Sequence, residues 1–318
     1  MKNTALVLMP LNKQQQDMFF SVSPNITFDF CSADSIDRER ISGADIIIGN
    51  PPPSMLMHAS KLKWIQLVTA GADKYQGKNI LDEKVLLTSA SGAYGEAQSE
   101  FMFASLLSLY KNLHLYRDSQ NKHLWRDEGN ERMLRDAAAL VIGMGDIGTS
   151  FAKRLKAFGV YVIGVRRHDL RPTEYADELH SVEHLGKLLP RADIVSLTVP
   201  ATPSTRHLLN REMFSLMKPE TVLVNAGRGS TVDTEALCDA LENRQLSGAC
   251  LDVMEPEPLP PTHRLWSMRN VIITPHVAGQ DFLPCTMEKT VTIAIDNLKA
   301  FLSGKPLKNI LSHQNLTV

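Results

Sequence analysis

The sequence predicts an α/β protein with two parallel-sheet domains, on three observations. Short apolar runs of strand length alternate with polar or helical segments. A second series of the same kind follows a helical stretch near residue 95. The 318 residues also suffice for two sizeable cores. We expect a Rossmann-type doubly wound dinucleotide-binding domain over residues 94–285, and a smaller flavodoxin-like substrate domain formed by 1–93 and 286–318.

The bulk properties narrow the functional classes. The formal net charge is -1, so no global basic field favours nucleic acid or an anionic membrane as a partner. No stretch approaches the roughly 20 apolar residues that cross a bilayer, and the apolar run in "MKNTALVLMP" is too short for a secretion signal. The cysteines form no C-x-x-C pair, so we expect no disulfide framework, no metal site and a reducing cytoplasm.

The first series contains the strand candidates "TALVLM", "ITFDF", "DIIIG" and "KWIQLV", each bounded by Gly, Pro, Asn or Asp. From Tyr94 to about Trp125 the pattern becomes helical. The second series begins with the strand "AAALVIG", the amphipathic helix "DIGTSFAKRLKAFG" and the strand "VYVIGV". Its later strand candidates are "ADIVSLTV", "TVLVNA", "GACLDV" and "NVIITP". A proline-stiffened loop, "MEPEPLPPTHRLW", separates the last two, and a helix over Met287–Leu302 ends the chain.

The stretch "LVIGMGDIG" carries a phosphate-binding pattern. Gly143, Gly145 and Gly148 have G-x-G-x-x-G spacing directly after a strand and at the start of a helix. Gly143 permits the tight turn, Gly145 lets backbone amides approach a pyrophosphate, and Gly148 lets helix and strand pack closely. A turn without a ligand is the alternative, but strand, glycines, helix and second strand all occur in order, which favours dinucleotide binding.

The second strand of this unit ends at Arg166 and Arg167, where the fingerprint expects an acid for the adenosine ribose. The nearest acid, Asp169, lies three residues beyond Arg166. A guanidinium would pair with a 2′-phosphate that an aspartate would repel. We therefore expect NADPH rather than NADH, unless both arginines are solvated surface charges.

Three polar residues follow strand candidates of the second unit: Arg228, Glu257 and His276. A histidine held protonated by a carboxylate can give a proton to a carbonyl oxygen during hydride transfer. An arginine can clamp a carboxylate and polarise the adjacent carbonyl. The set predicts reduction of a 2-oxo acid. Taken singly, Arg228 could cap a turn, Glu257 could be a solvated charge and His276 could be structural.

The motifs "GMGDIG", "VNAGRGS", "LDVMEPEPLP" and "ITPHVAG", with "ATPSTRHLLN" and "VTAGAD", resemble the D-isomer-specific 2-hydroxyacid dehydrogenases in order and separation. The resemblance covers nearly the whole chain. It implies that His276 is the acid/base, that Glu257 pairs with it and that Arg228 binds and polarises the substrate. It also implies that the amides around Gly71 and Ala72 receive the substrate carboxylate, in a cleft between the domains.

The same resemblance implies the remaining site residues. The predicted cofactor contacts are Gly143, Met144, Gly145, Asp146, Ile147, Gly148, Arg166, Arg167, Pro200, Thr205, Ala226, Asp252 and Gly279. Family members are commonly dimers, so we expect a homodimer. The stretch "LYRDSQNKHLW" is similar to the NADPH-using glyoxylate and hydroxypyruvate reductase branch, in which a Trp of the neighbouring subunit reaches the substrate, which makes Trp125 a candidate.

The leading hypothesis is therefore a cytoplasmic NADPH-dependent reductase of short 2-oxo acids to D-2-hydroxy acids. Alternatives are an NAD-dependent 2-hydroxyacid dehydrogenase and a dinucleotide-sensing module like the corepressor relatives of the family, which keep the same three residues. A formate-dehydrogenase-like enzyme is disfavoured because that branch has Gln where this chain has Glu257. Hydrolase chemistry is disfavoured because no Ser lies in a G-x-S-x-G elbow.

Overall fold

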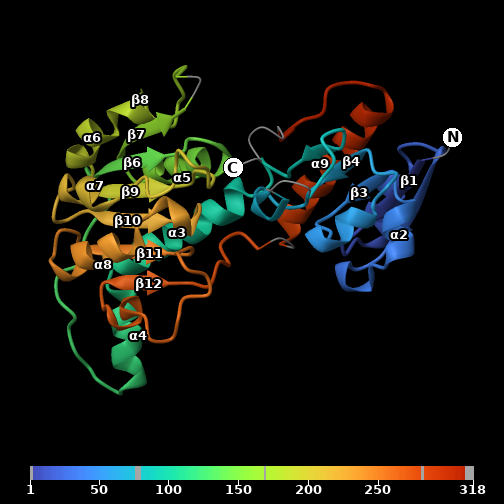
Figure 1. Cartoon of the computed structure of the whole chain (residues 1–318). Helices are drawn as coiled ribbons and strands as arrows, with labels where there is room; N and C mark the ends of the chain where they lie inside the picture. The colour runs from blue at the N-terminus through green and yellow to red at the C-terminus, as the bar shows by residue number, and fades with distance from the viewer. Residues whose placement is uncertain (1–2, 76–79, 168–169, 281–282, 312–318) are drawn as a thin grey trace. The chain divides into compact units, whose positions relative to one another are not determined.

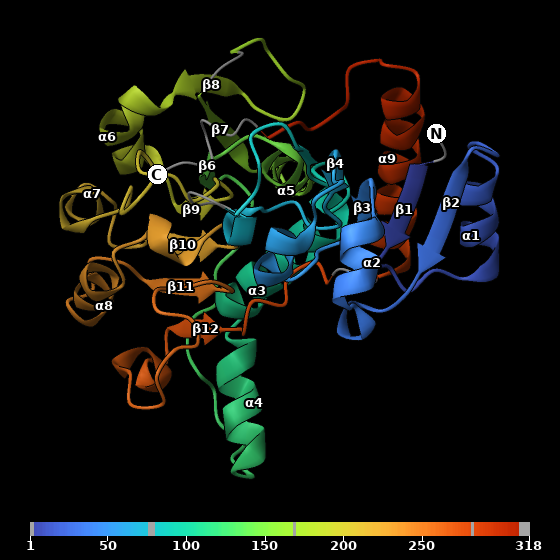
Figure 2. The same cartoon turned by 45° about the vertical axis from the view of Figure 1, so that its right-hand side comes forward.

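A computed structural model describes residues 3–75, 80–167, 170–280 and 283–311 of the chain. The chain divides into a first unit, Met1–Tyr94 with Asp281–Val318, and a second unit, Gly95–Gln280. Each unit contains one sheet whose paired strands are all parallel, flanked by helices (Figure 1, Figure 2). The predicted α/β fold class is confirmed.

The first unit has the strand order β2-β1-β3-β4-β5, which is the flavodoxin-like order. Its strands are β1 (Asn3–Val7), β2 (Ile26–Phe30), β3 (Ile46–Ile48), β4 (Trp64–Gln66) and β5 (Leu86–Thr88). Its α-helices are α1 (Lys13–Phe20), α2 (Arg38–Gly43) and α9 (Pro284–Leu302). No helix within the described residues is both long and apolar enough to cross a membrane.

Strand alternation sends apolar side chains of the first unit to both faces of its sheet. Ala5 and Val7 pack with the buried ring of Phe19 from α1, whereas Leu6 packs with Ile41 from α2. The face with α1 also receives α9, where Trp64 stacks on Phe301 with ring centroids 5.2 Å apart. The C-terminal helix therefore completes the core of the N-terminal sheet.

The second unit has the strand order β12-β11-β10-β9-β6-β7-β8. Its strands are β6 (Ala138–Ile142), β7 (Tyr161–Arg166), β8 (Glu178–Ser181), β9 (Ile194–Leu197), β10 (Val222–Asn225), β11 (Gly248–Leu251) and β12 (Val271–Ile273). Its α-helices are α3 (Gly95–Tyr110), α4 (Leu113–Asn121), α5 (Asp146–Ala157), α6 (Leu185–Leu188), α7 (Arg211–Ser215) and α8 (Thr234–Glu242). The order reverses between β6 and β9, and ligands of open α/β sheets bind at such a switch point.

Two cores lie on the two faces of this sheet. One contains Met102 of α3 with Phe151 and Leu155 of α5, and the other contains Phe214 of α7 and Leu237 of α8. Figure 2 shows α3 and α5 on one side of the strands and α6, α7 and α8 on the other. The inner strands β6, β9, β10 and β11 are buried on both faces, as near-continuous apolar runs predict, whereas the edge strands β8 and β12 are partly buried.

The structure corrects the prediction in three places. The helical stretch from Tyr94 to Trp125 is two helices, because Asn112 adopts a left-handed φ of 54° between α3 and α4, and α4 ends at Asn121. Phe158 belongs to the stretch predicted as an amphipathic helix, but it follows α5 as its C-cap and is exposed. The short edge strands β5 and β8 were not among the predicted strands, and β8, with the sequence ELHS, has no apolar or β-branched run.

Candidate functional site

The glycine loop joins β6 to α5 at the switch point. A Cβ on Gly143, where φ is +101°, would lie 3.0 Å from the Thr198 carbonyl carbon, and one on Gly148 would lie 2.1 Å from the Gly143 carbonyl oxygen. Both positions therefore require glycine. A Cβ on Gly145 would meet nothing within 4 Å, and Gly145 is exposed at the N-cap of α5. The loop thus has two closely packed glycines and one that faces open space.

The other predicted residues of this loop turn their side chains away from that space. Met144 is buried and Ile147 packs against the same core, on the α3–α5 side of the sheet. Asp146 accepts a 2.7 Å hydrogen bond from the Gly95 amide with its carboxylate. A ligand at this turn would meet backbone amides and the positive end of α5.

The two arginines lie at the end of β7. Arg166 is the last residue of the strand and is partly buried, while Arg167 is exposed and donates a 2.9 Å hydrogen bond to Ser204 Oγ. Ser204 lies in the loop after β9, which also contains Pro200 and Thr205. The Thr205 hydroxyl closes this loop by donating to the Pro200 carbonyl at 2.7 Å. Asp169 lies outside the described residues.

Ala226 and Gly279 are joined by a residue that sequence reasoning missed. The Gln98 side-chain amide donates to the Ala226 carbonyl at 2.5 Å, and a Cβ on Gly279 would lie 3.0 Å from Gln98 Cβ. Gly279 has a φ of +69°, so glycine is favoured there. Nothing in the sequence marks Gln98, because a single glutamine near the start of a helix is common on surfaces.

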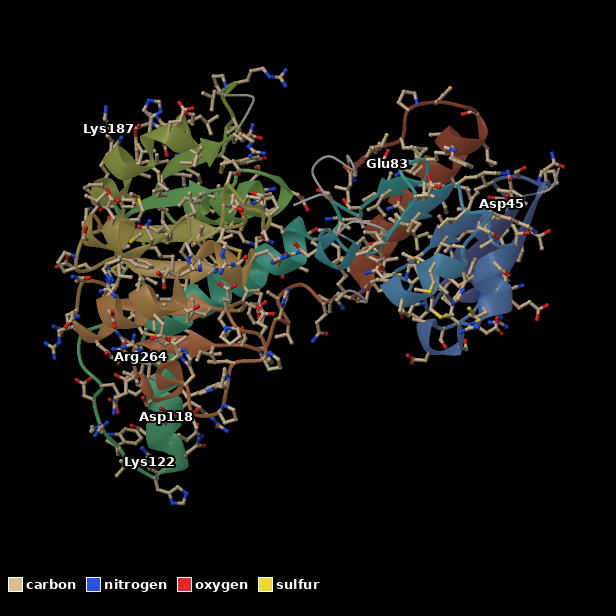
Figure 3. The ribbon with its side chains drawn as sticks, viewed as in Figure 1. Asp45, Glu83, Asp118, Lys122, Lys187 and Arg264 are labelled. Carbon is tan, nitrogen blue, oxygen red and sulfur yellow. The ribbon has the colours of Figure 1, made fainter. Side chains whose placement is uncertain are left out.

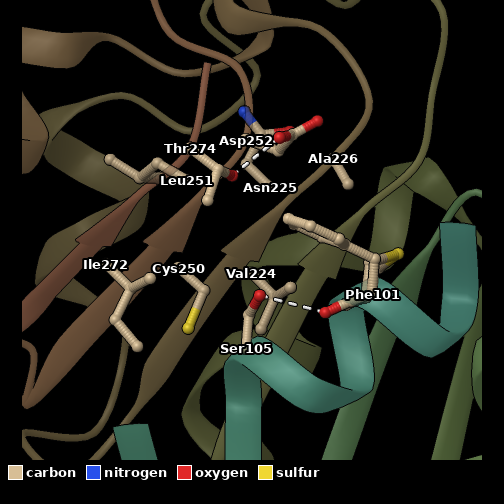
Figure 4. A pocket seen from close by; sticks show the side chains of 11 residues that line it. Phe101, Ser105, Val224, Asn225, Ala226, Cys250, Leu251, Asp252, Ile272 and Thr274 are labelled. Atoms are coloured by element: carbon tan, nitrogen blue, oxygen red, sulfur yellow. Dashed lines mark hydrogen bonds between the residues drawn. The ribbon is translucent and has the colours of Figure 1, made fainter. Parts of the chain in front are cut away.

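Asp252 is buried and holds the turn after β12. Its carboxylate accepts hydrogen bonds from the Thr274 hydroxyl at 2.7 Å and from the amides of Val277 and Ala278, both at 2.9 Å. Figure 4 shows Asp252 and Thr274 on the wall of a small pocket, which Phe101 and Cys250 also line. The Asp252 main-chain carbonyl accepts the amide of His276 at 2.9 Å. The prediction that Asp252 contacts the cofactor stays a prediction.

His276 and Glu257 form a hydrogen-bonded pair. His276 Nδ1 lies 2.8 Å from Glu257 Oε2, and Glu257 Oε1 accepts the Met254 amide at 3.0 Å. The bond to Glu257 raises the pKa of His276 above its usual value of 6.5, although partial burial and the Arg228 charge lower it. Partial burial alone would raise the pKa of Glu257, but the bonds from His276 and Met254, with the Arg228 charge, lower it overall. The pair therefore favours a protonated imidazole beside an ionised carboxylate.

Gly229 brings the Arg228 segment against this pair. A Cβ on Gly229 would lie 1.9 Å from the Met254 carbonyl oxygen, so only glycine allows the two backbones to touch. Arg228 itself is partly buried and donates from Nη1 to the Gly227 carbonyl at 2.7 Å. Gly227 in turn packs against Val199, and the Val199 side chain also leaves no room for a Cβ on Gly143. The segments of Arg228, Glu257 and the glycine loop therefore meet along one edge of the sheet.

Ion pairs anchor both ends of the loop that carries Glu257. Glu255 pairs with Arg206 at 2.9 Å and lies 3.1 Å from His207 Nε2. At the far end Arg264, labelled in Figure 3, pairs with Asp239 of α8 at 2.7 Å and with Glu235 and Glu242. These contacts fix the loop at two points on either side of Glu257.

Two predicted groups lie apart from this constellation in sequence. Gly71 and Ala72 belong to the first unit, in the segment after β4. Trp125 belongs to the segment between α4 and β6, and its side chain is fully exposed, with a relative accessibility of 106%. A reach of Trp125 into a neighbouring subunit stays a prediction.

Comparison with known proteins agrees with this architecture. Residues 103–278 match the family model described as D-isomer specific 2-hydroxyacid dehydrogenase, NAD binding domain. The chain is 33% identical to a glyoxylate reductase of Aeropyrum pernix, over 83% of this chain and 80% of that protein. Two solved structures are similar over nearly their full lengths. One is a D-isomer specific 2-hydroxyacid dehydrogenase family protein of Aeromonas salmonicida, with 31% identity, a TM-score of 0.86 and coverage of 98% of this chain and 100% of the other.

The second solved structure is an NADPH-dependent glyoxylate/hydroxypyruvate reductase of Sinorhizobium meliloti in complex with NADP and sulfate. It is 26% identical, with a TM-score of 0.81, and the match covers 99% of this chain and all of that chain. The similarity thus extends over both units.

The hydrogen bond between His276 and Glu257 predicts a specific titration. The imidazole of His276 should titrate above about 6.5, and Glu257→Gln should lower this pKa because the carboxylate charge is lost. NMR titration of the imidazole carbons measures both values, with the other histidines as internal reference. Identical His276 titrations in the two proteins would contradict the assignment.

The contact of Gly229 with Met254 predicts a selective loss of stability. Gly229→Ala should lower the free energy of unfolding by about 1–3 kcal/mol, because the new methyl group overlaps a backbone carbonyl. Gly186→Ala is the control, since its Cβ would meet only Leu216 at 3.6 Å. Denaturant unfolding of both variants checks this, and equal stabilities would show that the Gly229 contact is relieved at no cost.

Proposed function

This chain belongs to the D-isomer specific 2-hydroxyacid dehydrogenase family, and we propose that it is an NADPH-dependent reductase of short 2-oxo acids such as glyoxylate or hydroxypyruvate. The observation that carries the proposal is the 2.8 Å bond between His276 and Glu257 beside the Arg228 segment. The sequence similarity to a glyoxylate reductase supports the same substrate class.

The glycine loop fits a dinucleotide. Gly145 leaves open space at the N-terminus of α5, and the neighbouring side chains Met144 and Ile147 face the core. Backbone amides and the helix dipole would hold the pyrophosphate there. When bound, the reduced nicotinamide supplies the hydride for the carbonyl carbon.

His276 is the proposed proton donor. Its Nδ1 is engaged by Glu257, which leaves Nε2 to donate, and within the described residues Nε2 makes no hydrogen bond. The raised pKa keeps the imidazole protonated further into the neutral range. In the reduction, His276 gives its Nε2 proton to the carbonyl oxygen, becomes neutral and regains a proton from water. Glu257 stays ionised and stabilises the imidazolium.

The proposed substrate contacts are Arg228, Gly71 and Ala72. The guanidinium of Arg228 would pair with the carboxylate of a 2-oxo acid and polarise the carbonyl next to it. We assign the amides of Gly71 and Ala72 as a second carboxylate contact. A substrate with both a carboxylate and an adjacent carbonyl uses all of these groups, whereas a simple aldehyde uses only part of them.

Preference for NADPH rests on Arg166 and Arg167. They occupy the end of β7, where an acid would favour NADH. The bond from Arg167 to Ser204 holds this exposed side chain toward the loop after β9, on the other side of the switch point. A 2′-phosphate would meet a cation there instead of a carboxylate.

The role of His276 predicts an inactive variant that retains its cofactor. His276→Asn should lower kcat by about 10²–10⁴-fold, because the proton donor is lost, while NADPH affinity measured by fluorescence stays unchanged. His123→Asn is a matched control, since His123 has a φ of 55° and His276 one of 54°. Wild-type turnover in the His276 variant would eliminate it as the acid.

The arginines predict the cofactor preference. A panel of glyoxylate, hydroxypyruvate and pyruvate should show higher kcat/KM with NADPH than with NADH. Replacing Arg166 and Arg167 by Ala should raise the KM for NADPH roughly tenfold or more and leave that for NADH unchanged. The exposed Arg38→Ala serves as control. Equal rates with NADH in the wild type would refute the preference but not the reductase assignment.

A further inference from the structure

The carboxyl ends of β3 and β4 lie side by side in the first unit. The two strands are paired in register, and the Gly49 amide continues the ladder by donating to the Gln66 carbonyl at 2.8 Å. Asn50 therefore stands next to the segment that follows β4, residues 67–72. This segment contains Gly71 and Ala72, the proposed carboxylate contact.

Asn50 uses both ends of its side-chain amide on this segment. Its Oδ1 accepts the Val68 amide at 3.0 Å, and its Nδ2 donates to Thr69 Oγ1 at 3.0 Å. The orientation of the Asn50 amide is fixed, because a backbone N–H can only donate and must face the oxygen. The Thr69 hydroxyl oxygen thus accepts a hydrogen bond from Asn50, and the hydroxyl proton can be donated to another acceptor.

That acceptor is the Gly71 carbonyl, 2.7 Å from Thr69 Oγ1. The carbonyl of Gly71 and the N–H of Ala72 belong to one planar trans peptide, so they point in opposite directions. Fixing the carbonyl toward Thr69 therefore turns the Ala72 N–H away from it. Within the described residues neither the Gly71 nor the Ala72 amide donates a hydrogen bond. The relative accessibility of Ala72 is only 9%. Ala72 is buried and Gly71 is partly buried, and a buried amide without a partner is costly unless a ligand accepts it.

Further contacts hold the same segment from other sides. The Tyr94 hydroxyl donates to the Val68 carbonyl at 2.7 Å, and the Ala90 amide donates to the Thr69 carbonyl at 2.9 Å. The Tyr75 hydroxyl donates to the Pro51 carbonyl at 2.9 Å, which ties the Asn50 loop to the residues after Ala72. The orientation of the Ala72 amide, and the path of the segment that carries Gly71, are thus set before any ligand binds.

We propose that Asn50 and Thr69 are positioning residues that orient the Ala72 amide, and hold the segment of Gly71, for the carboxylate of the substrate. The inference rests on the proposed function, since it assumes a carboxylate ligand at these amides. It adds two residues to the site, neither of which touches the reacting atoms. Their effect should appear in substrate affinity and not in proton transfer.

The test compares two substitutions at one position. Thr69→Val keeps the shape but removes the hydroxyl, whereas Thr69→Ser keeps the hydroxyl. We expect Thr69→Val to raise the KM for glyoxylate and the Kd for oxamate, measured by calorimetry on the NADP-loaded protein, about tenfold. The kcat and the KM for NADPH should stay near wild type, and Thr69→Ser should behave as wild type. Asn50→Ala should reproduce the Thr69→Val result.

Each outcome separates the two proposals. Oxamate binding that is equal in wild type and Thr69→Val would overturn the positioning role, as would a wild-type protein that does not bind oxamate. A loss of affinity in Thr69→Ser equal to that in Thr69→Val would also overturn it, because the hydroxyl would then be irrelevant. Oxamate binding with the expected differences but no turnover of any 2-oxo acid would count against the reductase activity alone.

Discussion

The buried carboxylate of Asp252 is the interaction on which the site most depends. It sits at the end of β11 and accepts three hydrogen bonds from residues 274–278, so the turn after β12 is held by one side chain of its neighbouring strand. His276 lies in this turn with a left-handed φ of 54°, a conformation that costs a non-glycine residue on the order of 1–3 kcal/mol. The Asp252 contacts offset that cost. They also hold the turn that carries the imidazole, which lies 2.8 Å from Glu257.

Next to this turn, the other loops at the same edge of the sheet contact one another where glycines let their backbones approach closely. Gly229 lies against Met254, whose amide also binds Glu257, and Gly227 and Gly143 both pack on the segment of Thr198 and Val199. The loops after β6, β9, β10 and β11 therefore form one layer in contact. Parallel strands make this layer possible, because all their carboxyl ends lie at the same edge. The chemistry that we propose uses residues from several of these loops, none of which could form a site alone.

Much of this could be predicted from the sequence, for identifiable reasons. The two strand series and the glycine spacing are local patterns, so the fold class and the loop at Gly143 follow from them. The break at Asn112 could not be predicted, since asparagine is also tolerated within helices and only its backbone angle shows the turn. The contacts of Gln98, Ser204 and Asn50 join segments that are far apart in the chain, and common polar residues carry no signal of such partners. The pairing of His276 with Glu257 was expected from the family resemblance and not from spacing.

Glu257, His276, Arg228 and Asp252 all belong to the second unit, as do the anchors at Glu255 and Arg264. The acidity of the imidazole is therefore set by groups of the same unit. Substitutions in the first unit should therefore leave the affinity of the imidazole for a proton unchanged. The proposed substrate affinity at Gly71 and Ala72 and the pKa of His276 could then be altered independently, by natural selection or by protein engineering.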